Sequence, residues 1–534
     1  MPIEMGKLVL DDDRAEAALP EALLRSEAYP HAAQRPRLIT THISWILLAG
    51  RFAYKLKRPV DLGFVDYTTR DRREHFCQEE LLLNRRLTRD VYLDVVPIVQ
   101  TPAGIRVSGD GAVIDHAVRM RRLPQQRMLN RLLARGDIDG EQAAEIGSLI
   151  ARFHATATRA APGDPGGAAT VQENIAENFR QTRPFVSRTI TPEQFAAITS
   201  YSEHFVKQNE TLLDVRQTAG WVRDVHGDLR ADNICLSQGI QVFDCIEFSR
   251  RLRIEDVAAE VAFLAMDFDF WGYPELARVF VAAYASSSPD PQLRDLLPFY
   301  QCYRAYVRGK VESLRLDQPD LAQVDARSAI RRARRYFALA DKYARRRPVL
   351  LLVTGLSGTG KSRLATRLAD LLAWPVLNSD RVRKELAGLA AESRVPAADE
   401  AGIYDQAFTE RTYAALLDGA DHLLSAGNSI VLDATFLLRD QRDAAQALAA
   451  RHRAALRMIV CTAPEAVVAT RLAERATEPT AVSDAGWDVY MAQRRHQEPV
   501  QRAEGTVLRL STTQRPETLA RRALRWLSEP ARFD

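Results

Sequence analysis

The chain has 534 residues, of which 46% are apolar and 27% are charged, and its formal net charge at pH 7 is +4. This composition is ordinary for a globular protein of two to four domains, and the net charge is too small to indicate a nucleic-acid partner by itself. No window approaches eighteen apolar residues without a charge, so no membrane span and no membrane partner are predicted.

The first twenty residues carry acidic residues early and contain no apolar core, so no secretion signal is expected. The five cysteines are scattered and form no C-x-x-C pair, which indicates reduced thiols and argues against disulfides or a zinc site. Both features favour a cytoplasmic protein. The cysteines are Cys77, Cys235, Cys245, Cys302 and Cys461.

From about 36 to 122, short β-type runs alternate with turns, and one helical segment at 71–87 interrupts them. From about 125 to 345 the pattern is mostly helical. The sequence therefore predicts a small sheet lobe followed by a larger helical lobe. Residues 325 to 348 hold eight arginines, and they predict either an amphipathic helix with a solvated basic face, followed by a linker, or an anion-attracting wall between two sites.

After the arginine-rich segment, apolar strands alternate with amphipathic helices up to about residue 528. This alternation predicts a parallel sheet covered by helices on both faces. We place the boundary between the two parts near 345 to 348, giving domains 1–346 and 347–534. The expected fold class is an α+β bilobal domain followed by an α/β domain.

Residues 226–233 read "HGDLRADN", and Asp244 ends a later apolar strand. Phosphoryl transfer needs a held triphosphate, a metal that neutralises its charge and an acceptor hydroxyl aimed in line. In this spacing Asp228 can accept the acceptor's proton, whereas Asn233 and Asp244 can each hold Mg²⁺. Arg230 can reach the transferring phosphoryl group, as the corresponding lysine does in protein kinases.

Upstream, "FAYK" ending at Lys55 resembles the kinase strand whose lysine grips the α- and β-phosphates, with Lys57 as the alternative. The usual partner of that lysine is a glutamate on the next helix. In the predicted helix at 71–87, Glu80 lies on the same face as a stripe of apolar residues. This face is expected to be buried, and a buried charge needs a partner of opposite charge. The pattern therefore favours Glu80 over Glu79.

With these motifs, and with "IARFHA" at 150–155, residues about 36 to 310 resemble the aminoglycoside phosphotransferase family, which has a kinase-like fold. The resemblance implies phosphorylation of a small-molecule hydroxyl with ATP or GTP, and it implies a structural role for Asp256 on a helix bracing the catalytic loop. The first lobe departs from kinases because it has no G-x-G-x-x-G, and only Gly50 lies in the hairpin before Lys55.

The acceptor of this first centre is nearly unreadable from the sequence. Asp267, Asp269 and Glu275 could line a site for a cationic acceptor, or they could simply belong to an acidic helix end and loop. The family resemblance alone does not make the chain a resistance enzyme.

Residues 355–362 read "GLSGTGKS", after a buried strand and before an amphipathic helix. In such a P-loop the glycines let backbone N–H groups face the phosphates, the lysine reaches the β- and γ-phosphates, and the serine holds Mg²⁺. The predicted nucleotide-binding residues of this loop are Gly355, Ser357, Gly358, Thr359, Gly360, Lys361 and Ser362, and Ser362 is also a predicted metal ligand.

Further candidates follow the next strands. Asp380 can take a proton from an acceptor hydroxyl, Arg383 lies one helical turn on and can hold an anionic acceptor, and Asp433 lies at a Walker-B-like place near magnesium. Arg471 and Arg475 lie one turn apart and can close on the triphosphate as a lid. Each arginine could instead belong to a solvated helix face.

With these elements, residues 349 to 530 resemble the P-loop kinases grouped with polynucleotide 5′-kinase, gluconate kinase and the zeta toxins. The resemblance implies that Asp380 is the general base, that Arg383 binds the acceptor and that Arg471 and Arg475 belong to the lid.

The leading hypothesis is a bifunctional ATP-dependent phosphotransferase with two magnesium–nucleotide sites that act on small-molecule hydroxyls. One alternative is a nucleotide-dependent regulatory protein in which one or both domains do not turn over. The other is a nucleic-acid 5′-end kinase in the second domain, with the arginine segment as a backbone groove; nucleic acid is the less favoured partner. The sequence does not predict the oligomeric state.

Overall fold

The computed structural model describes residues 19–528, apart from 64, 319–321, 346, 373, 392, 394–401, 426, 477–482, 484 and 502–503. The first eighteen residues, on which most of the secretion-signal prediction depends, lie outside the described residues. The chain divides into two compact units, Met1–Arg345 and Arg346–Asp534. None of the helices in the described ranges is both long and apolar enough to cross a membrane.

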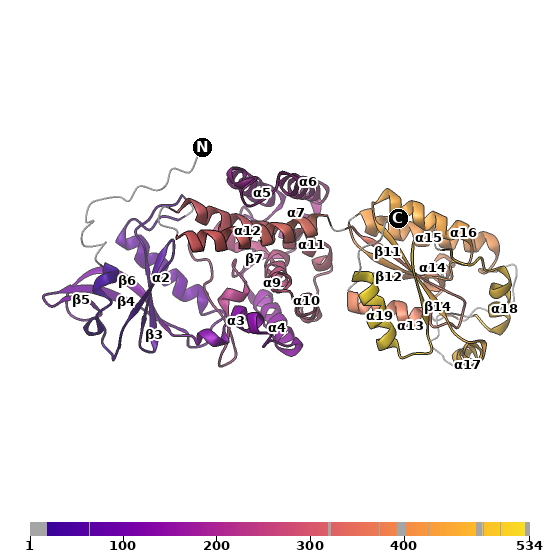
Figure 1. Ribbon diagram of the computed structural model, residues 1–534, viewed down its shortest axis with the longest axis horizontal. Coiled ribbons are helices and arrows are strands. Elements are labelled where there is room, and N and C mark those ends of the chain that lie inside the picture. The colour runs from indigo at the N-terminus through magenta and orange to yellow at the C-terminus, as the bar shows by residue number, and fades with distance from the viewer. Residues whose placement is uncertain are drawn as a thin grey trace. The chain divides into compact units, whose positions relative to one another are not determined.

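The first unit begins with a sheet of six antiparallel strands in the order β1-β2-β3-β6-β4-β5, with one helix packed against it (Figure 1). These elements are β1 (Arg37–Thr40), β2 (Ser44–Ala49), β3 (Phe52–Lys57), α2 (Arg70–Asn84), β4 (Tyr92–Thr101), β5 (Gly104–Val107) and β6 (Ala112–Arg121).

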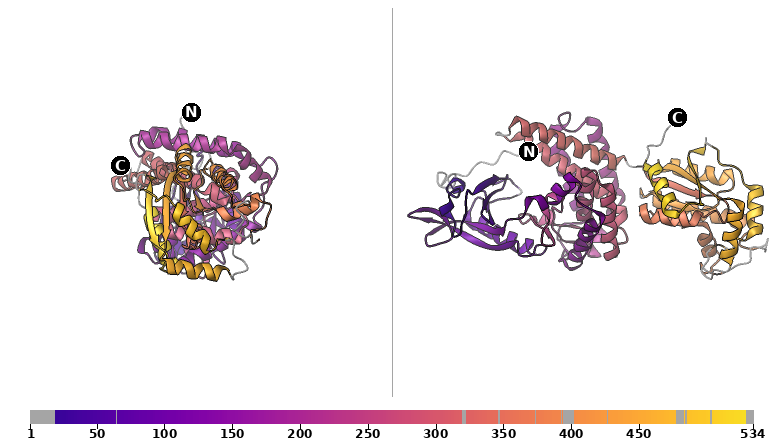
Figure 2. Two further views of the ribbon diagram at one scale, coloured as in Figure 1. Left: turned by 90° about the vertical axis from the view of Figure 1, so that its right-hand side faces the viewer. Right: turned by 60° about the horizontal axis from the view of Figure 1, so that its bottom comes forward.

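The rest of the first unit is a helical lobe, which the right-hand view of Figure 2 shows apart from the sheet lobe. Its helices are α3 (Leu129–Arg135), α4 (Gly140–Thr156), α5 (Ala168–Thr182), α6 (Pro192–Gln208), α7 (Glu210–Thr218), α8 (Arg250–Arg253), α9 (Val257–Trp271), α10 (Pro274–Ser287), α11 (Leu293–Leu314) and α12 (Gln323–Ala344). Two short antiparallel pairs lie among them: β7 (Val222–Asp224) with β10 (Ile254–Asp256), and β8 (Ile234–Leu236) with β9 (Ile240–Val242).

Local sequence signals explain where the helices of this lobe begin. Asp139 and Gln142 form a capping box at the start of α4, and Thr191 and Gln194 form another at the start of α6, where Pro192 takes the first helical position. Helix α9 is apolar nearly all round and is buried over most of its length, so it forms the centre of the helical lobe. The arginine-rich segment forms α12, which packs along α11.

The second unit is a five-stranded parallel sheet in the order β12-β13-β11-β14-β15. One apolar cluster joins the sheet to α15 and α16, and another joins it to α13 and α19, so helices cover both faces (Figure 1). The strands are β11 (Val349–Thr354), β12 (Val376–Asn378), β13 (Ile430–Asp433), β14 (Ala455–Thr462) and β15 (Thr506–Ser511); the helices are α13 (Lys361–Leu372), α14 (Ser379–Leu386), α15 (Gln406–Ser425), α16 (Arg439–Arg451), α17 (Glu465–Ala476), α18 (Trp487–His496) and α19 (Pro516–Ser528).

The predicted fold class is thereby confirmed for both parts of the chain. The run 38–50, read as one β-type segment from the sequence, is instead a hairpin, because residues 41–43 turn the chain between β1 and β2. The alternation of strands and helices in the sequence did not predict two of the helices, α14 and α18. Both lie beside the P-loop region and carry residues of the second site.

Candidate active sites

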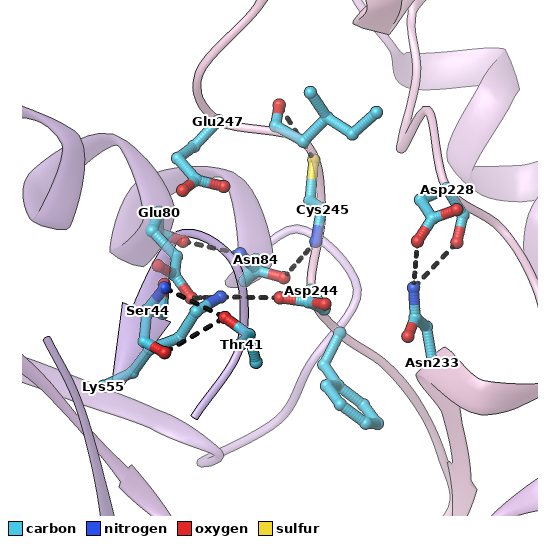
Figure 3. A network of polar contacts seen from close by, with 12 residues as sticks. Thr41, Ser44, Lys55, Glu80, Asn84, Asp228, Asn233, Asp244, Cys245 and Glu247 are labelled. Carbon is cyan, nitrogen blue, oxygen red and sulfur yellow. Dashed lines mark hydrogen bonds and ion pairs between the residues drawn. The ribbon is translucent and has the colours of Figure 1, made fainter. Parts of the chain in front are cut away.

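The catalytic-loop motif lies between β7 and β8 and brings three predicted residues together. Asn233 Nδ2 donates to Asp228 Oδ2 at 2.8 Å and to the main-chain oxygen of Asp228 at 3.0 Å (Figure 3). Arg230 Nε donates to the same carboxylate oxygen at 2.9 Å. The predicted base therefore lies between one predicted metal ligand and the predicted phosphoryl-binding arginine.

The charge of Asp228 is set by opposing influences. Burial raises the pKa of its carboxyl, but Arg230 and Arg308 lower it further than burial raises it, so the pKa lies below its ordinary value. Asp228 is therefore ionised at neutral pH, which is the form that can accept a proton.

His226 connects the catalytic loop to the segment before Asp244. Its Nε2 lies 3.0 Å from the carbonyl oxygen of Phe243, which can only accept, and the backbone N–H of Asp228 donates to its Nδ1 at 3.3 Å. These partners require the neutral tautomer with the proton on Nε2. Burial lowers the pKa of His226, which also favours the neutral ring.

Asp244 adopts a left-handed backbone conformation with φ of 65°, and its carboxylate lies 2.6 Å from Lys55 Nζ. Although 44% of its side-chain surface is exposed, desolvation by the surrounding protein raises its pKa; Lys55 more than offsets this, and the pKa falls to about 2. Asn84 on α2 accepts the next backbone N–H, that of Cys245, at 2.9 Å. Figure 3 shows Asp244 between the Lys55–Glu80 pair and the Asp228–Asn233 pair.

The predicted pairing of Lys55 with Glu80 is present, with Nζ and Oε1 2.8 Å apart. Glu80 is fully buried, as the apolar stripe of its helix indicated, whereas Glu79 is only partly buried. Lys57, the alternative lysine, lies on the same face of β3 and contacts the other oxygen of Glu80 at 2.5 Å. Lys55 alone of the two also contacts Asp244, which distinguishes their positions.

Glu247 was missed by the sequence analysis. It is buried, it contacts Lys57, and it accepts a hydrogen bond from Tyr67 at 2.8 Å. Its place three residues after Asp244 was a usable signal, because a carboxylate that follows a metal-binding strand end into a buried segment requires a cation nearby. Lys57, Glu247 and Tyr67 thus tie the segment after Asp244 to the sheet lobe.

The brace of the catalytic loop is Glu260 on α9, and not Asp256. Glu260 accepts the backbone N–H of Gly227 at 2.6 Å and that of His226 at 3.2 Å, and His154 of the "IARFHA" helix lies 2.7 Å from it. A carboxylate followed by six apolar residues in the first turns of an apolar helix was the signal for it.

Asp256 has a structural role in the helical lobe, as expected, but at a different place. It caps α9 through the N–H of Ala258 and binds Arg216 with both oxygens, at 2.6 and 2.8 Å. Arg216 also binds Asp290 with two hydrogen bonds of 2.7 Å, so Asp256 belongs to a buried ion-pair network.

The register of the sheet places Gly50 in the hairpin before Lys55, as expected, and a second turn at the other end of β2. Lys55 pairs with Ile46 and Lys57 with Ser44, so the end of β3 that carries the lysines lies beside the turn at 41–43. Gly50 forms the turn at the opposite end of these strands. The residues next to the predicted phosphate-binding lysine are therefore Thr41 and Ser44, which Figure 3 shows close to it.

The acidic residues considered for a cationic acceptor have other partners. Asp267 is buried and accepts the backbone N–H of Ala231 at 2.8 Å, and burial raises its pKa to about 6. Asp269 accepts from Tyr343 at 2.5 Å, and Glu275 pairs with Arg278 on the exposed face of α10. These contacts favour the interpretation in which the three acidic residues belong to an acidic helix end and loop, and not to a site for a cationic acceptor.

In the second unit, the P-loop joins β11 to α13. Gly355 and Gly358 have φ of 139° and 77°, and a Cβ on Gly355 would lie 2.4 Å from the carbonyl oxygen of Cys461, so these positions require glycine. Lys361 Nζ donates to the loop's own Leu356 carbonyl at 3.1 Å. The backbone N–H of Ser357 donates to Gln493 on α18 at 2.9 Å, a contact that the sequence did not predict.

Asp433 lies at the end of β13, beside the end of β11 that leads into the P-loop. Its Oδ2 accepts from Asn378 at 2.7 Å, whereas its Oδ1 is buried and has no hydrogen-bond partner in the described part of the chain. Burial raises the pKa of Asp433, and the charge of Lys361 and the polar groups of Ser362 and Asn378 oppose that rise. Burial also lowers the pKa of Lys361, and the charges of Asp433 and Asp380 oppose that fall.

Asp380 lies in the first turn of α14, where Asn378 caps the helix, and Arg383 follows one turn later. Arg383 is 7% exposed; its guanidinium donates to Ile403 and Thr409 and lies over the ring of Tyr404. Its Nε is buried and has no hydrogen-bond partner among the described residues. This arginine is thus held by the segment before α15 and by Thr409 in the first turn of α15.

The two predicted lid arginines differ in position. Arg471 lies beside the P-loop, because its guanidinium binds Thr512 at 2.9 and 2.7 Å and Thr512 in turn donates to the carbonyl of Thr359 at 2.6 Å. Arg475 donates to the carbonyl of Ala485 at 2.5 Å, in the segment that leads to α18.

Comparisons with known proteins match the two units of the chain to two different families. A family model described as "Phosphotransferase enzyme family" matches residues 79–297, and one described as "AAA domain" matches residues 350–500. The uncharacterized protein Rv2004c of Mycobacterium tuberculosis is 34% identical over 441 residues, which cover 82% of this chain and 85% of that protein.

Two solved structures are similar in part. A sugar kinase from a Janibacter species is 22% identical, with a TM-score of 0.26, over 34% of this chain and 94% of that chain. A choline/ethanolamine kinase family protein from Mesorhizobium loti is 13% identical, with a TM-score of 0.36, over 62% of this chain and 98% of that chain. The family matches confirm the two resemblances expected from the sequence.

Proposed function

The chain belongs to one family with the mycobacterial protein Rv2004c and carries a phosphotransferase-family domain followed by a P-loop kinase domain, and on this premise we propose that it is a bifunctional phosphotransferase. Each domain transfers the γ-phosphoryl group of ATP or GTP to a hydroxyl group of a small molecule. The observation that carries the proposal is that Lys55 joins Glu80 to Asp244 beside the Asp228–Asn233 pair.

In the first domain, Asp228 accepts the proton of the acceptor hydroxyl, and its low pKa keeps it ionised for this task. Lys55 binds the α- and β-phosphates, and Glu80 holds that lysine in place. Arg230, which lies on Asp228, provides positive charge for the transferring group.

The donors of both sites suit magnesium, which prefers carboxylate and amide oxygens and takes few protein ligands when phosphates supply others. In the first domain these donors are Asn233 and Asp244. In the second they are Ser362 and Asp433, whose buried and unpartnered Oδ1 favours a cation there. When bound, Mg²⁺ neutralises the negative charge of the phosphates.

In the second domain, the backbone of 355–362 cradles the phosphates and Lys361 reaches the β- and γ-phosphates. Asp380 accepts the proton of the acceptor, and Arg383, whose Nε has no partner among the described residues, binds an anionic group of that acceptor. Arg471, placed beside the P-loop, and Arg475 form a lid over the triphosphate.

The test uses the full chain with γ-labelled ATP and a metabolite pool that includes sugars, aminoglycosides, nucleosides and oligonucleotides. We compare the wild type with Asp228→Asn, Asp380→Asn and the double variant, since each substitution keeps the side-chain shape and removes one base. We expect two sets of labelled products, one lost in each single variant and both lost in the double variant.

Other results would contradict the proposal. Variants that bind ATP and leave the wild-type products unchanged would favour a regulatory protein without turnover. Labelled oligonucleotide ends, together with a steep dependence of binding on salt, would make the second domain a nucleic-acid kinase.

A further inference from the structure

Three arginines of the helical lobe gather on one carboxylate. Glu312, near the end of α11, is 3.0 Å from Arg332 of α12, 3.3 Å from Arg315 and 3.8 Å from Arg308. The side chain of Glu312 is 6% exposed, whereas those of Arg332 and Arg315 are 37% and 32% exposed. One carboxylate cannot neutralise three guanidinium groups, so this cluster keeps a surplus of positive charge.

The cluster lies beside the catalytic loop. The charge of Arg308 lowers the pKa of Asp228, the proposed base, and also acts on Asp267. Helix α11, which carries Arg308 and Glu312, packs along α9, whose Asp267 accepts the backbone N–H of Ala231 in the catalytic loop. Gln318, three residues after Arg315, contacts His42 in the turn between β1 and β2. The cluster thus lies in the part of the helical lobe that adjoins the catalytic loop and the turn at 41–43.

The carboxylates nearby are already engaged. Asp228 and Asp232 share Arg230, and Asp232 also accepts from Asn130. Asp267 is buried against the N–H of Ala231. Moreover, Arg308 Nε is buried and has no hydrogen-bond partner among the described residues. The surplus charge and the free donor both suit an anion that arrives with the substrate.

We propose that Arg308, Arg315 and Arg332 bind the anionic group, a carboxylate or a phosphate ester, of the hydroxyl compound that the first domain phosphorylates. This inference rests on the proposed function of that domain and adds the class of its acceptor. Guanidinium groups bind carboxylate and phosphate with paired hydrogen bonds, which would orient the hydroxyl toward Asp228. A cationic amino alcohol would be repelled by the same cluster.

The experiment uses the full chain with Asp380→Asn, so that label comes from the first site alone, and γ-labelled ATP. Four pools at equal concentration are compared: hydroxy acids, sugar phosphates, neutral sugars and polyols, and cationic amino alcohols with aminoglycosides. We expect label in the hydroxy-acid or the sugar-phosphate pool, and these two arms distinguish the carboxylate from the phosphate ester.

Variants then test the cluster itself, with the labelled compound as the probe. Arg308→Gln and Arg332→Gln should each raise its KM about tenfold or more and leave the KM for ATP unchanged, and Arg308→Lys should recover part of the loss. Arg331→Gln, on the exposed face of α12, is the matched control and should change neither value. If Arg308→Gln or Arg332→Gln has a lower melting temperature than the parent, Arg315→Gln is measured in its place.

Label only in the neutral or cationic pools would overturn the inference while the proposed phosphotransferase activity stands. A labelled anionic compound whose KM is unchanged by the cluster variants would show that the arginines only join α11 to α12. No label in any pool would remove the proposed activity of the first site, and the inference with it.

Discussion

Glu80 forms ion pairs with two lysines at once: Lys55 Nζ lies 2.8 Å from Oε1 and Lys57 Nζ lies 2.5 Å from Oε2. All three side chains are buried. Lys55 also contacts Asp244, and Lys57 also contacts Glu247. This single carboxylate therefore supports two of the connections between the sheet lobe and the segment after β9.

The first prediction concerns the loss of that carboxylate. Glu80→Gln should destabilise the first unit by about 3–5 kcal/mol, because two buried ammonium groups lose a charge that offsets their desolvation. In calorimetric unfolding of the full chain, the transition of the first unit should move to lower temperature, and the other transition should stay in place. Glu79→Gln on the same helix is the control, and an equal shift in both variants would contradict the assignment.

The second prediction separates the two lysines. In a chain whose second site is disabled by Lys361→Ala, Lys55→Met should weaken Mg-ATP binding by roughly tenfold or more, because Lys55 alone reaches Asp244. Lys57→Met should mainly lower the melting temperature, since it leaves Glu247 without its cation. Titration calorimetry with Mg-ATP, carried out well below the melting temperature, measures the binding of both variants. A larger loss of binding in Lys57→Met than in Lys55→Met would assign phosphate binding to Lys57.

The third prediction follows from Asp267, whose pKa burial raises to about 6 from an ordinary 3.8. The folded protein holds this proton more tightly than the unfolded chain, so its contribution to stability is full below about pH 4 and is lost as pH rises to about 6. Asp267→Asn keeps an acceptor for the N–H of Ala231 and removes the titration.

The free energy of unfolding of Asp267→Asn should therefore depend less on pH between about 4 and 6. At pH 7 it should exceed that of the wild type by on the order of 2 kcal/mol. Melting temperatures measured from pH 4 to 7 give the comparison. Glu275→Gln on the exposed face of α10 should follow the wild-type curve, and a parallel curve for Asp267→Asn would show that the carboxyl does not titrate in this range.

The fourth prediction concerns metal in the second domain. Asp433→Asn should raise the Mg²⁺ concentration needed for half-maximal nucleotide binding about tenfold, because an amide is a weaker ligand than the carboxylate whose Oδ1 is free. Fluorescent-nucleotide titrations at several Mg²⁺ concentrations measure it, with Lys55→Met in the background to reduce binding at the first site. Asp443→Asn, half-exposed on α16, is the control and should match the parent.

A fifth prediction concerns a buried arginine of the second unit. Arg442 is buried, binds Glu504 at 2.5 Å and donates to the carbonyl of Phe436 at 2.9 Å, so it is a structural residue and not a phosphate ligand. Arg442→Met should lower the melting temperature of the second unit and leave the KM for ATP near that of the parent below that temperature. Loss of ATP binding without loss of stability would contradict this.

Much of the two sites was readable because phosphate chemistry demands particular residue types at particular spacings. Asp228, Asn233 and Asp244 are close in the sequence, and the strand and helix around the P-loop place Lys361 and Asp433 at one edge of a parallel sheet. Glu80 could be chosen over Glu79 because a helix has a definite buried face. These predictions rest on local periodicity and short spacing.

What escaped the sequence was the choice of partner across long separations. Glu260 rather than Asp256 contacts the catalytic loop, Lys57 pairs with Glu247, and the turn at 41–43 adjoins the end of β3 that carries the lysines. Each depends on sheet register or on how helices pack, and neither leaves a fixed spacing in the chain.

The amino-acid sequence by itself predicted the two-part architecture and the phosphotransferase and P-loop kinase resemblances of the two parts, because periodicity and motif spacing are local properties of the chain. Only the tertiary structure decided which charges are already neutralised. The acidic residues near the first centre are engaged by other groups, while three arginines from α11, the turn after it and α12 share Glu312, and a surplus of charge of this kind exists only once distant segments are packed together.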